Sequence, residues 1–555
     1  MNRNVLVAAA WPYVNGSLHL GHVAALLPAD ILARYFRAHG DHVLYVSGSD
    51  CHGTPILVSA EREGVAPEII AGRYHDEVVE MLIHKLGFSY SLYSKTMGAF
   101  HQRTAQDLFR RLYDGGHMVE REEEQLYCVT CTRFLPDRYV EGTCPYCAAR
   151  GARGDQCDQC GQTLDAGDLV TPQCKICHTK PERRRSTHLY FRLSAFEARL
   201  TAWIKERSVA WRSNASAVTA SWLTRGLHDR PITRDLTWGI PVPVDAYVAK
   251  RMYVWFEAVM GYFSCSKEWA ASTDNPEGWR QWWENDDALH YYVHGKDNIP
   301  FHTIIWPAML MALGYKLPDA IVSSEYLNFE GVKLSKSAGM ALWLPEALAK
   351  FDPDALRFVL VLNGPETHDT SFSWKEFQAR VHGDLIGTIG NLWNRTYTLV
   401  YQHRDIIGSA RPAVVADDSA KLLGAAAAAF TDVGTAIERT EFRVALQRIL
   451  ALAKQCNQYL NARQPWKLIR DPATQSDAAE AITTAAIFGD ALRRLMAPFT
   501  PHIADALGTY LGCDDVRWCM PTTVPSPTAP PTPLIRHIDD ALIEAELAKL
   551  APPAP

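Results

Sequence analysis

The sequence lacks the features of a secreted or membrane protein. No run of apolar residues approaches the ~20 residues that a membrane-spanning helix needs. The N-terminus, Met1-Asn2-Arg3-Asn4, does not have the charged and then apolar layout of a signal peptide. The composition is that of an ordinary globular protein, so we expect a cytoplasmic protein that does not bind a membrane.

An excess of positive charge and two nucleotide-binding motifs are also missing. The formal net charge is −6 at pH 7, so no global positive field recruits nucleic acid, and any RNA must be bound by local patches. The chain contains no Gly-x-Gly-x-x-Gly and no Gly-Lys-Ser/Thr loop. These absences argue against a dinucleotide-dependent enzyme and a P-loop ATPase.

Strand-like and helical patterns alternate in two separate parts of the chain. Apolar runs typical of parallel strands and segments with helical spacing make up the pattern: strands at 5–10, 42–47, 289–294 and 320–324, and helices at 21–39 and 100–114. Such alternation predicts a doubly wound parallel sheet, in which nucleotides bind at the carboxyl ends of the strands. At 555 residues the chain is long enough for roughly two to four domains.

Eight of the thirteen cysteines form four Cys-x-x-Cys pairs in a stretch with little apolar content of its own. The pairs are Cys128/Cys131, Cys144/Cys147, Cys157/Cys160 and Cys174/Cys177. Four thiolates per tetrahedral ion give about two closed, structural Zn²⁺ sites, and a module with so small a core needs the metal to fold. Free thiols and redox pairs are the alternatives, but a redox pair is usually single and lies at a helix start. The spacing leaves open which pairs share an ion.

Long helical patterns without intervening strands follow after about residue 345. They predict a helix bundle with helices at 384–401, 418–438, 441–461 and 478–496. Residues 521–533 are rich in Pro, Thr and Ser, which is typical of an extended connector, and residues 536–550 regain an amphipathic pattern.

These patterns predict an α/β protein: a Rossmann-like doubly wound parallel sheet with a zinc-knuckle insertion, followed by an all-α helix bundle. The expected units are a split nucleotide-binding domain, the insertion, the helical domain, and a connector with a final helix. Their limits are 1–117 with 189–345, 118–188, 346–520 and 521–555.

Two short motifs carry the chemistry. His19-Leu20-Gly21-His22 follows the first expected strand and opens the first expected helix, where free N–H groups and the helix dipole favour an anion such as phosphate. Far along the chain, Lys333-Leu334-Ser335-Lys336-Ser337 places two ammonium groups close together on a loop. Each motif alone is weak, since a histidine pair is more often structural or a metal site. Together they indicate triphosphate chemistry.

In this order the two motifs resemble the two signatures of class I aminoacyl-tRNA synthetases. Within that class, four further stretches resemble the methionyl-tRNA synthetases: Ala10-Trp11-Pro12-Tyr13-Val14-Asn15-Gly16, Phe134-Leu135-Pro136-Asp137-Arg138, Tyr253-Val254-Trp255-Phe256-Glu257-Ala258 and Gly295-Lys296-Asp297-Asn298-Ile299-Pro300-Phe301-His302. The resemblance covers residues 5 to about 550. It implies ATP-dependent activation of methionine as methionyl-adenylate and transfer to tRNA, with Mg²⁺ accompanying ATP.

The resemblance also implies roles for individual residues. Asp50 would bind the methionine ammonium group, and Asp297 would contact the ribose or help to order the site. The group that binds ATP and stabilises charge on its phosphates comprises His19, Gly21, His22, Lys333 and Lys336. The pocket for the methionine side chain comprises Tyr13, Trp255, Ala258, Tyr262 and His302.

In the family the helical bundle reads the anticodon. Asn391 and Arg395 are spaced to share one helix face, and Trp466 follows the break at Gln464-Pro465. A polar pair beside an exposed aromatic side chain is how single-stranded RNA bases are bonded and stacked. The partner tRNA would then be held at its anticodon and its acceptor end. Some family members carry a further C-terminal dimerising domain, and its absence favours a monomer.

Rival functions fit less well. The branched-chain synthetases of class I carry a large editing insertion where this chain has its cysteine pairs, and the cysteine enzyme uses an open zinc site. A non-catalytic paralogue that binds tRNA or an amino acid is the alternative from a different class. The intact residues His19, His22, Lys333 and Lys336 argue against it.

The chain departs from the family pattern in three places. Leu334 stands where methionine is commoner, and Glu257 stands where aspartate is usual, which is expected to add a methylene beside the pocket. Trp11 stands where a smaller aliphatic residue is usual. Its indole either packs away from the methionine pocket or narrows it.

Overall fold

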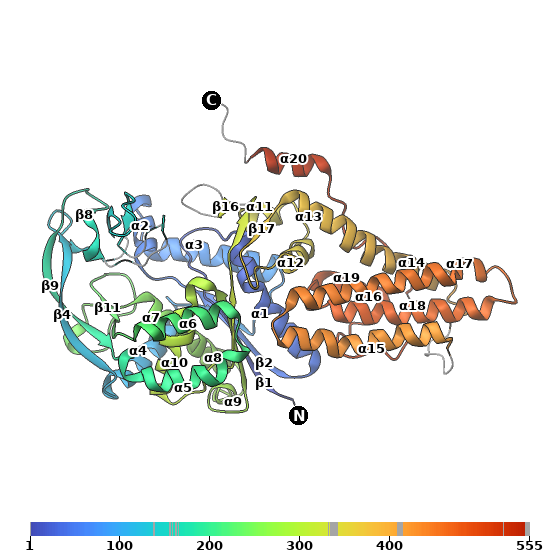
Figure 1. Ribbon diagram of the computed structural model, residues 1–555, viewed down its shortest axis with the longest axis horizontal. Coiled ribbons are helices and arrows are strands. Elements are labelled where there is room, and N and C mark those ends of the chain that lie inside the picture. The colour runs from blue at the N-terminus through green and yellow to red at the C-terminus, as the bar shows by residue number, and fades with distance from the viewer. Residues whose placement is uncertain are drawn as a thin grey trace.

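The computed structural model describes residues 2–136, 139–154, 157, 159–160, 164, 166–330, 332–333, 342–407, 415–525 and 527–549. The molecule is elongated, with an α/β lobe at one end and a bundle of long helices at the other (Figure 1). A ribbon of two long strands marks the outer edge of the α/β lobe.

Five parallel strands form the central sheet in the order β14-β13-β1-β2-β3: Ala320–Ser324, Leu289–Gly295, Asn4–Ala9, His42–Ser49 and Leu92–Lys95. The chain adds strands on one side of β1 first and on the other side much later. The order therefore reverses between β1 and β13, and a crevice forms at the carboxyl ends of neighbouring strands at such a point. The doubly wound parallel sheet predicted from the sequence is confirmed.

The two faces of the sheet are buried in two different cores. Along β1, Val5, Val7 and Ala9 pack with helix α1 (Leu20–His39), whereas Leu6 and Ala8 belong to the core on the other face. That second core contains helices α4 (Ala99–Asp114), α8 (Gly261–Ala271) and α10 (Trp306–Leu313). From Val5 to Ala9, β1 is apolar at every position because each face of the pleat meets a helical layer.

Further helices surround this sheet. They are α2 (Thr54–Glu63), α3 (Pro67–Val79), α5 (Glu197–Arg207), α6 (Ser213–Arg225), α7 (Val254–Ala258) and α9 (Arg280–Trp283).

The cysteine-rich insertion is carried on a long antiparallel ribbon of β4 (Met118–Cys128) and β9 (Glu182–Phe191). The short strands β5 (Arg133–Phe134) and β10 (Arg230–Pro231) extend this ribbon at its edges. Between β4 and β9 lies a small sheet of β7, β6 and β8 (Ala152–Arg153, Val140–Thr143 and Val170–Cys174). Its small core contains four cysteines, Cys128, Cys144, Cys157 and Cys174, beside a few apolar side chains.

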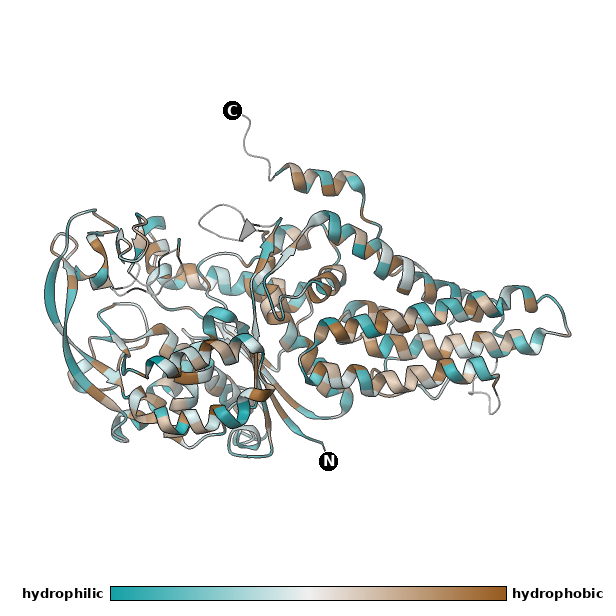
Figure 2. Cartoon of the chain, in the orientation of Figure 1, coloured by the Kyte–Doolittle hydropathy of each residue, from teal (hydrophilic) through white to brown (hydrophobic). Residues whose placement is uncertain are grey.

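A second small sheet of β16, β15 and β17 (Val332–Lys333, Leu327–Phe329 and Thr370–Phe372) follows β14. Helices α11 (Leu344–Leu348) and α12 (Pro353–Leu362) then lead to the bundle. The helices of the bundle turn their apolar sides inward, as the hydropathy colours show (Figure 2). They are α13 (Trp374–Arg380), α14 (Asn391–Gln402), α15 (Asp417–Glu438), α16 (Phe442–Arg463), α17 (Pro465–Leu468), α18 (Gln475–Met496) and α19 (Pro501–Leu511).

Two helices differ from the sequence expectation. The helix expected at 384–401 begins earlier, because α13 continues into α14 through Val381–Gly390, which has the wider π-helical hydrogen bonding. At Gly387 a Cβ atom would come within 2.9 Å of the His382 carbonyl oxygen, so a residue without a side chain fits this turn. The final helix α20 covers Asp540–Ala548, within the expected 536–550, and its Lys350–Glu546 ion pair ties it to the segment after α11.

Helix α15 is long and apolar enough, by length and composition alone, to cross a membrane. Leu422, Ala426, Phe430 and Val433 are buried in the common core with α16 and α18, which is the ordinary position of such a helix inside a bundle.

Candidate active site

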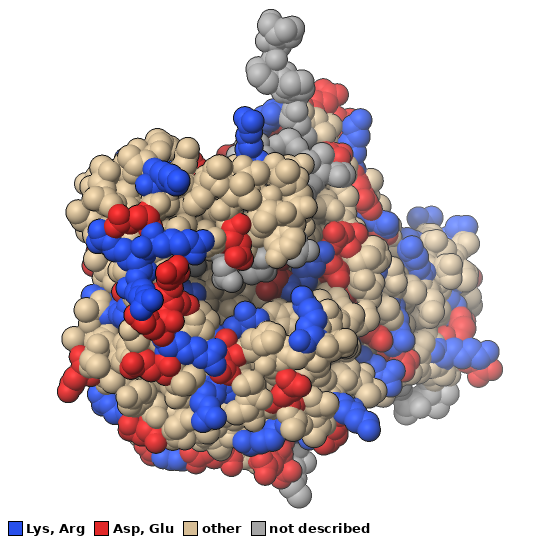
Figure 3. All heavy atoms as spheres, turned by 60° about the vertical axis from the view of Figure 1, so that its left-hand side comes forward, with Lys and Arg blue, Asp and Glu red and all other residues tan. Residues whose placement is uncertain are grey.

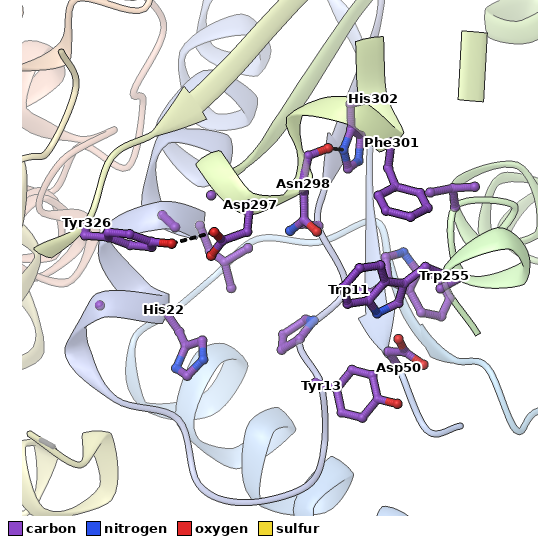
Figure 4. Close-up of a pocket in the computed structure, with 18 of the residues that line it drawn as sticks. Trp11, Tyr13, His22, Asp50, Trp255, Asp297, Asn298, Phe301, His302 and Tyr326 are labelled. Carbon is purple, nitrogen blue, oxygen red and sulfur yellow. Dashed lines mark hydrogen bonds between the residues drawn. The ribbon is translucent and has the colours of Figure 1, made fainter. Parts of the chain in front are cut away.

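A pocket of about 480 Å³ lies at the carboxyl ends of β1, β2, β13 and β14, beside the first turn of α1 (Figure 4). Ten of the residues expected to contact ATP or methionine line it: Tyr13, His19, Gly21, His22, Asp50, Trp255, Ala258, Tyr262, Asp297 and His302. The parallel sheet brings them together because the ends of its strands meet at one edge.

The two histidines of the first motif hold the start of helix α1. His19 is the N-cap residue, and its backbone N–H donates to Nδ1 of His22 at 3.1 Å in a reciprocal cap. The two rings lie 3.8 Å apart between centroids. Because Nδ1 of His22 accepts this bond, the proton of the neutral ring is on Nε2. The first turn of α1 therefore combines the positive end of the helix dipole with an imidazole N–H donor.

Asp50 lies at the end of β2 and is 3% exposed. Its backbone pairs with the chain near Tyr13, since Asp50 N–H donates to Pro12 O at 2.9 Å and Val14 N–H donates to Asp50 O at 3.1 Å. Burial, and after it the charge of Glu257, raises the pKa of Asp50 well above its usual range. A carboxyl group in this position favours a cationic ligand, which would make the ionised form stable.

The apolar end of the pocket is built around Tyr262 and His302. Nδ1 of His302 lies 2.8 Å from the carbonyl oxygen of Asn298 and so donates to it, which leaves Nε2 to accept the Tyr262 hydroxyl at 2.8 Å. Burial lowers the pKa of His302 to about 4, so the ring is neutral at physiological pH. Trp255 is 40% exposed and meets Phe301 edge to face at 5.2 Å.

This end of the pocket is lined by aromatic faces with no full charge, which suits a polarisable thioether. Phe301, Asn298 and Val259 also line it and were not singled out from the sequence. Phe301 and Asn298 belong to the quoted motif at 295–302, so the motif itself was the available signal.

Asp297 faces the pocket from the segment after β13, where its carboxylate accepts the Tyr326 hydroxyl. The neighbouring Lys296 ammonium donates to Glu325 at 2.6 Å and to Asp369 at 2.7 Å. These contacts fix the segment that carries Asp297 against the residues that follow β14. Glu325, Tyr326 and Leu327 also line the pocket and were missed, because nothing in their local sequence marks them.

Only the first residue of the second motif, Lys333, lies within the described part of the chain. Of Lys333, the backbone in β16 is described, and it pairs with Asn328 in β15. Lys336 lies outside the described residues, as does Leu334.

The eight paired cysteines form two clusters. Cys128, Cys131, Cys174 and Cys177 make one, and Cys144, Cys147, Cys157 and Cys160 make the other, with all ligand atoms of each within 4.8 Å of one another. The pairing that the spacing left open is thus the first pair with the fourth and the second with the third. Such a set of four thiols fits a tetrahedral Zn²⁺ ion.

Each cluster includes a thiol that ionises readily. Hydrogen bonds from Thr179 lower the pKa of Cys177 to about 6, and the backbone N–H of Cys160 lowers the pKa of Cys157 to about 7. The clusters differ in position, because Cys157 also lines the pocket. The second cluster therefore forms part of the pocket wall.

The residues expected to contact RNA lie together near one end of the bundle. The Arg395 guanidinium stacks 5.0 Å from the centre of the Trp466 ring, and it donates to Asn461 Oδ1 at 3.0 Å. Trp466 is half-buried rather than exposed, and Asn391 is exposed at the start of the same helix as Arg395. Asn461 was not foreseen, because it comes from α16.

The contacts of Glu257 and Trp11, two of the three departures from the family pattern, are defined in the structure. Glu257 was expected beside the pocket, but its side chain lies behind the wall and bonds to His52 and His101. The Trp11 ring lies against Gly48 and Gly261, where a Cβ atom would come within 2.5 and 2.7 Å of the indole. Trp11 also lines the pocket, so it packs against the two glycines and forms part of the pocket wall.

Two family models match the chain. The model described as "tRNA synthetases class I (M)" matches residues 5–397, and the model described as "Anticodon-binding domain of tRNA ligase" matches residues 420–516. Among curated proteins, a methionine–tRNA ligase of Bacillus cereus (strain 03BB102) is 43% identical over 552 residues, which is 99% of each chain. The protein named methionine–tRNA ligase 2 of Bacillus anthracis is equally similar, at 43% identity and the same coverage.

Among solved structures, the methionyl-tRNA synthetase of Mycobacterium tuberculosis in complex with methionyl-adenylate has a TM-score of 0.78 and 25% sequence identity. The match covers 96% of this chain and 99% of that one. The free form of the same mycobacterial protein matches with a TM-score of 0.72 and 23% identity, over 97% and 99% of the two chains.

Proposed function

Because this chain belongs to the class I tRNA synthetases of the methionine type, we propose that it attaches methionine to tRNA in an ATP-dependent reaction through methionyl-adenylate. The proposal rests on three features that lie in one pocket. They are an anion-binding helix start at His19 and His22, a buried carboxyl group at Asp50, and an apolar end at Tyr262 and His302.

These three parts match the three parts of the reactants. The ammonium group of methionine binds Asp50, and its thioether enters the apolar end between Tyr262, His302 and Trp255. Tyr13 and Ala258 complete the walls around it. The methionine carboxylate is then directed toward the start of α1, where the ATP phosphates bind.

The first step is attack of the methionine carboxylate on the α-phosphorus of ATP, with pyrophosphate as the leaving group. The carboxylate oxygen forms the new P–O bond as the bond to the β-phosphate oxygen breaks. The N–H of His22 and the helix dipole meet the charge that develops on the phosphates, and Lys333 and Lys336 do the same from the second motif. Asp297 contacts the ribose hydroxyls. Positioning and charge stabilisation supply most of the rate enhancement in such a transfer.

The second step transfers the methionyl group to the terminal ribose of tRNA and releases AMP. Mg²⁺ enters with ATP and neutralises part of the phosphate charge. The two cysteine clusters hold about one structural Zn²⁺ each, because four thiolates close the coordination sphere and leave no position for substrate.

The helical bundle holds the anticodon, with Trp466 stacking on a base and Arg395 and Asn391 bonding to base edges. The functional units are the catalytic domain at 1–117 and 189–345, the zinc insertion at 118–188, the anticodon-binding domain at 346–520 and the C-terminal segment at 521–555. We further propose a cytoplasmic monomer that does not bind a membrane.

The test is direct detection of the products. The purified chain is incubated with ATP, Mg²⁺, tRNA and one of methionine, isoleucine, leucine, valine or cysteine, and the adenylate and aminoacyl-tRNA are identified by mass spectrometry. Methionine alone should give both products. Binding of tRNA without either product would instead support the non-catalytic paralogue.

A further inference from the structure

Three ionisable side chains form a buried group directly behind the pocket. Glu257 lies on α7 between Phe256 and Ala258, and its two carboxylate oxygens are both bonded to imidazoles. Oε1 lies 2.7 Å from Nδ1 of His52, and Oε2 lies 2.8 Å from Nε2 of His101. The side chains of Glu257 and His101 are fully buried, and His52 is 2% exposed. None of the three lines the pocket.

One end of this group is tied to the ammonium site through the backbone of His52. The His52 N–H donates to Oδ1 of Asp50 at 3.4 Å, and the His52 carbonyl oxygen accepts the Tyr13 hydroxyl. Both Asp50 and Tyr13 line the pocket. Because the His52 ring is held by Glu257, the peptide that bonds to these two residues is held as well.

The other end of the group reaches α8 and the ring of Trp11. Nδ1 of His101 lies 2.7 Å from Oγ of Ser264, and that oxygen also lies 3.1 Å from the carbonyl oxygen of Gly261. The His101 ring also meets the Trp11 ring at 5.7 Å between centroids. A single carboxylate thus connects α7, α4, α8 and the segment after β2, and all of these except α4 carry residues that line the pocket.

The charges of the group also favour a cation in the pocket. Burial alone would raise the pKa of Glu257, but the two imidazoles outweigh it and lower that pKa, so the carboxylate is ionised. Asp50 then lies close to a second buried negative charge. Two neighbouring carboxylates in a buried site are unfavourable together unless a cation joins them. A ligand ammonium group supplies that cation.

We propose that Glu257 is a positioning residue which, through His52 and His101, holds Asp50 and Tyr13 in place and adds a second negative charge behind the site for the substrate ammonium group. The inference rests on the proposed function, since it assumes that the amino acid binds at Asp50. A group that served only to pack these four elements together would affect every ligand of the pocket alike.

The experiment compares two ligands that differ only in the amino group. Methioninol carries the ammonium group and the thioether, and its deaminated counterpart is the same thioether alcohol without the amino group. Their dissociation constants are measured by calorimetry with the wild type, Glu257→Gln and Glu257→Asp, all at the same pH. The KM of ATP is measured in parallel, because ATP binds away from Asp50.

The wild type should prefer methioninol, and Glu257→Gln should reduce this preference by roughly 10–100-fold, the range for a charged hydrogen-bonded contact. The affinity of the deaminated alcohol and the KM of ATP should stay close to the wild-type values. Glu257→Asp keeps the charge and should restore most of the preference. Equal weakening of both alcohols, or an unchanged preference in Glu257→Gln, overturns the inference.

Ser264→Ala provides a second variant if Glu257→Gln does not fold. It removes only the outer partner of His101, and the preference for methioninol should fall by a few-fold, on the scale of one neutral hydrogen bond. An unchanged preference overturns the inference here too. If the wild type does not activate methionine, the proposed function is contradicted. If the wild type activates methionine and Glu257→Gln keeps the full preference for methioninol, only this inference is contradicted.

Discussion

The pocket and the outer end of the bundle hold their side chains in different ways. In the pocket, groups from several strands and helices are fixed by buried hydrogen bonds, as in the chain from Tyr262 through His302 to Asn298. In the bundle, Arg395 stacks on the half-buried ring of Trp466 and donates a hydrogen bond to Asn461 near the surface. Charge that develops during a reaction requires fixed groups in a dry site, whereas stacking on RNA requires accessible ring faces.

The two cysteine clusters show the same kind of difference on a smaller scale. The cluster that contains Cys157 forms part of the pocket wall, and the cluster of Cys128 and Cys177 lies at the end of the β4–β9 ribbon. Figure 3 shows this side of the molecule, with lysine and arginine side chains gathered beside acidic ones over the insertion. Three exposed arginines follow one another along β9, and in the ribbon register Arg185 lies opposite Glu124, Arg184 opposite Gln125 and Arg183 opposite Leu126.

The largest expected effect is on the chemical step in the pocket. His22→Ala removes an N–H donor from the phosphate site and should slow adenylate formation on the order of 10²–10³-fold, the usual cost of one charge-stabilising group. The KM of methionine should change little. Pyrophosphate exchange measures this, and His39→Ala, at the exposed other end of α1, is the matched control. An exchange rate equal to that of the wild type would contradict the assigned role.

Trp466→Ala should separate the two regions. Loss of a base-stacking ring costs ~1–3 kcal/mol, or roughly 5–150-fold in kcat/KM for tRNA charging. Methionine activation without tRNA should be unaffected, because the ring is far from the pocket in the fold. Trp518→Phe, which keeps an aromatic ring at a buried position of the bundle, controls for loss of stability. If both half-reactions decline equally, Trp466 serves only the core.

The cysteine clusters are compared by Cys157→Ser and Cys177→Ser. Each variant should lose about one of two zinc ions, as measured by atomic emission on freshly purified protein. Only Cys157→Ser should raise the KM of methionine or ATP, by roughly tenfold, because only that cluster forms wall of the pocket. Equal kinetic effects of the two variants would contradict the comparison, and fresh protein without zinc would contradict the metal assignment.

The smallest effect is expected for Trp11→Leu. Its indole lies against two glycines and lines the pocket, so a smaller side chain opens space without removing a polar contact. Methionine should bind nearly as before, while an analogue with a longer side chain should gain roughly tenfold in the exchange assay, within the range for one methylene group. If the longer analogue gains no more than methionine does, the ring is only a packing element.

The sequence predicted the sheet and most helices well, because their patterns are local. Alternation of strands and helices gave β1, α1 and β2 to within two residues. It missed the early start of the helix before α14, since π-helical hydrogen bonding at Val381–Gly390 has no simple periodic signature.

The contents of the site were partly predictable. Residues within recognisable motifs, such as His22, Asp50 and His302, meet in the pocket as the resemblance implied. The pairing of the cysteines, the position of Glu257 behind the wall and the partner Asn461 of Arg395 depend on tertiary contacts between distant segments. No local pattern encodes such contacts.

The most direct test of the central claim is ATP–pyrophosphate exchange by the purified chain in the absence of tRNA. Label from pyrophosphate should enter ATP when methionine is present, and should enter far more slowly with isoleucine, leucine, valine or cysteine in its place. The reaction should be equally fast in Trp466→Ala, because the pocket alone forms the adenylate. Absence of methionine-dependent exchange in a folded, zinc-loaded protein would contradict the claim that this pocket activates methionine.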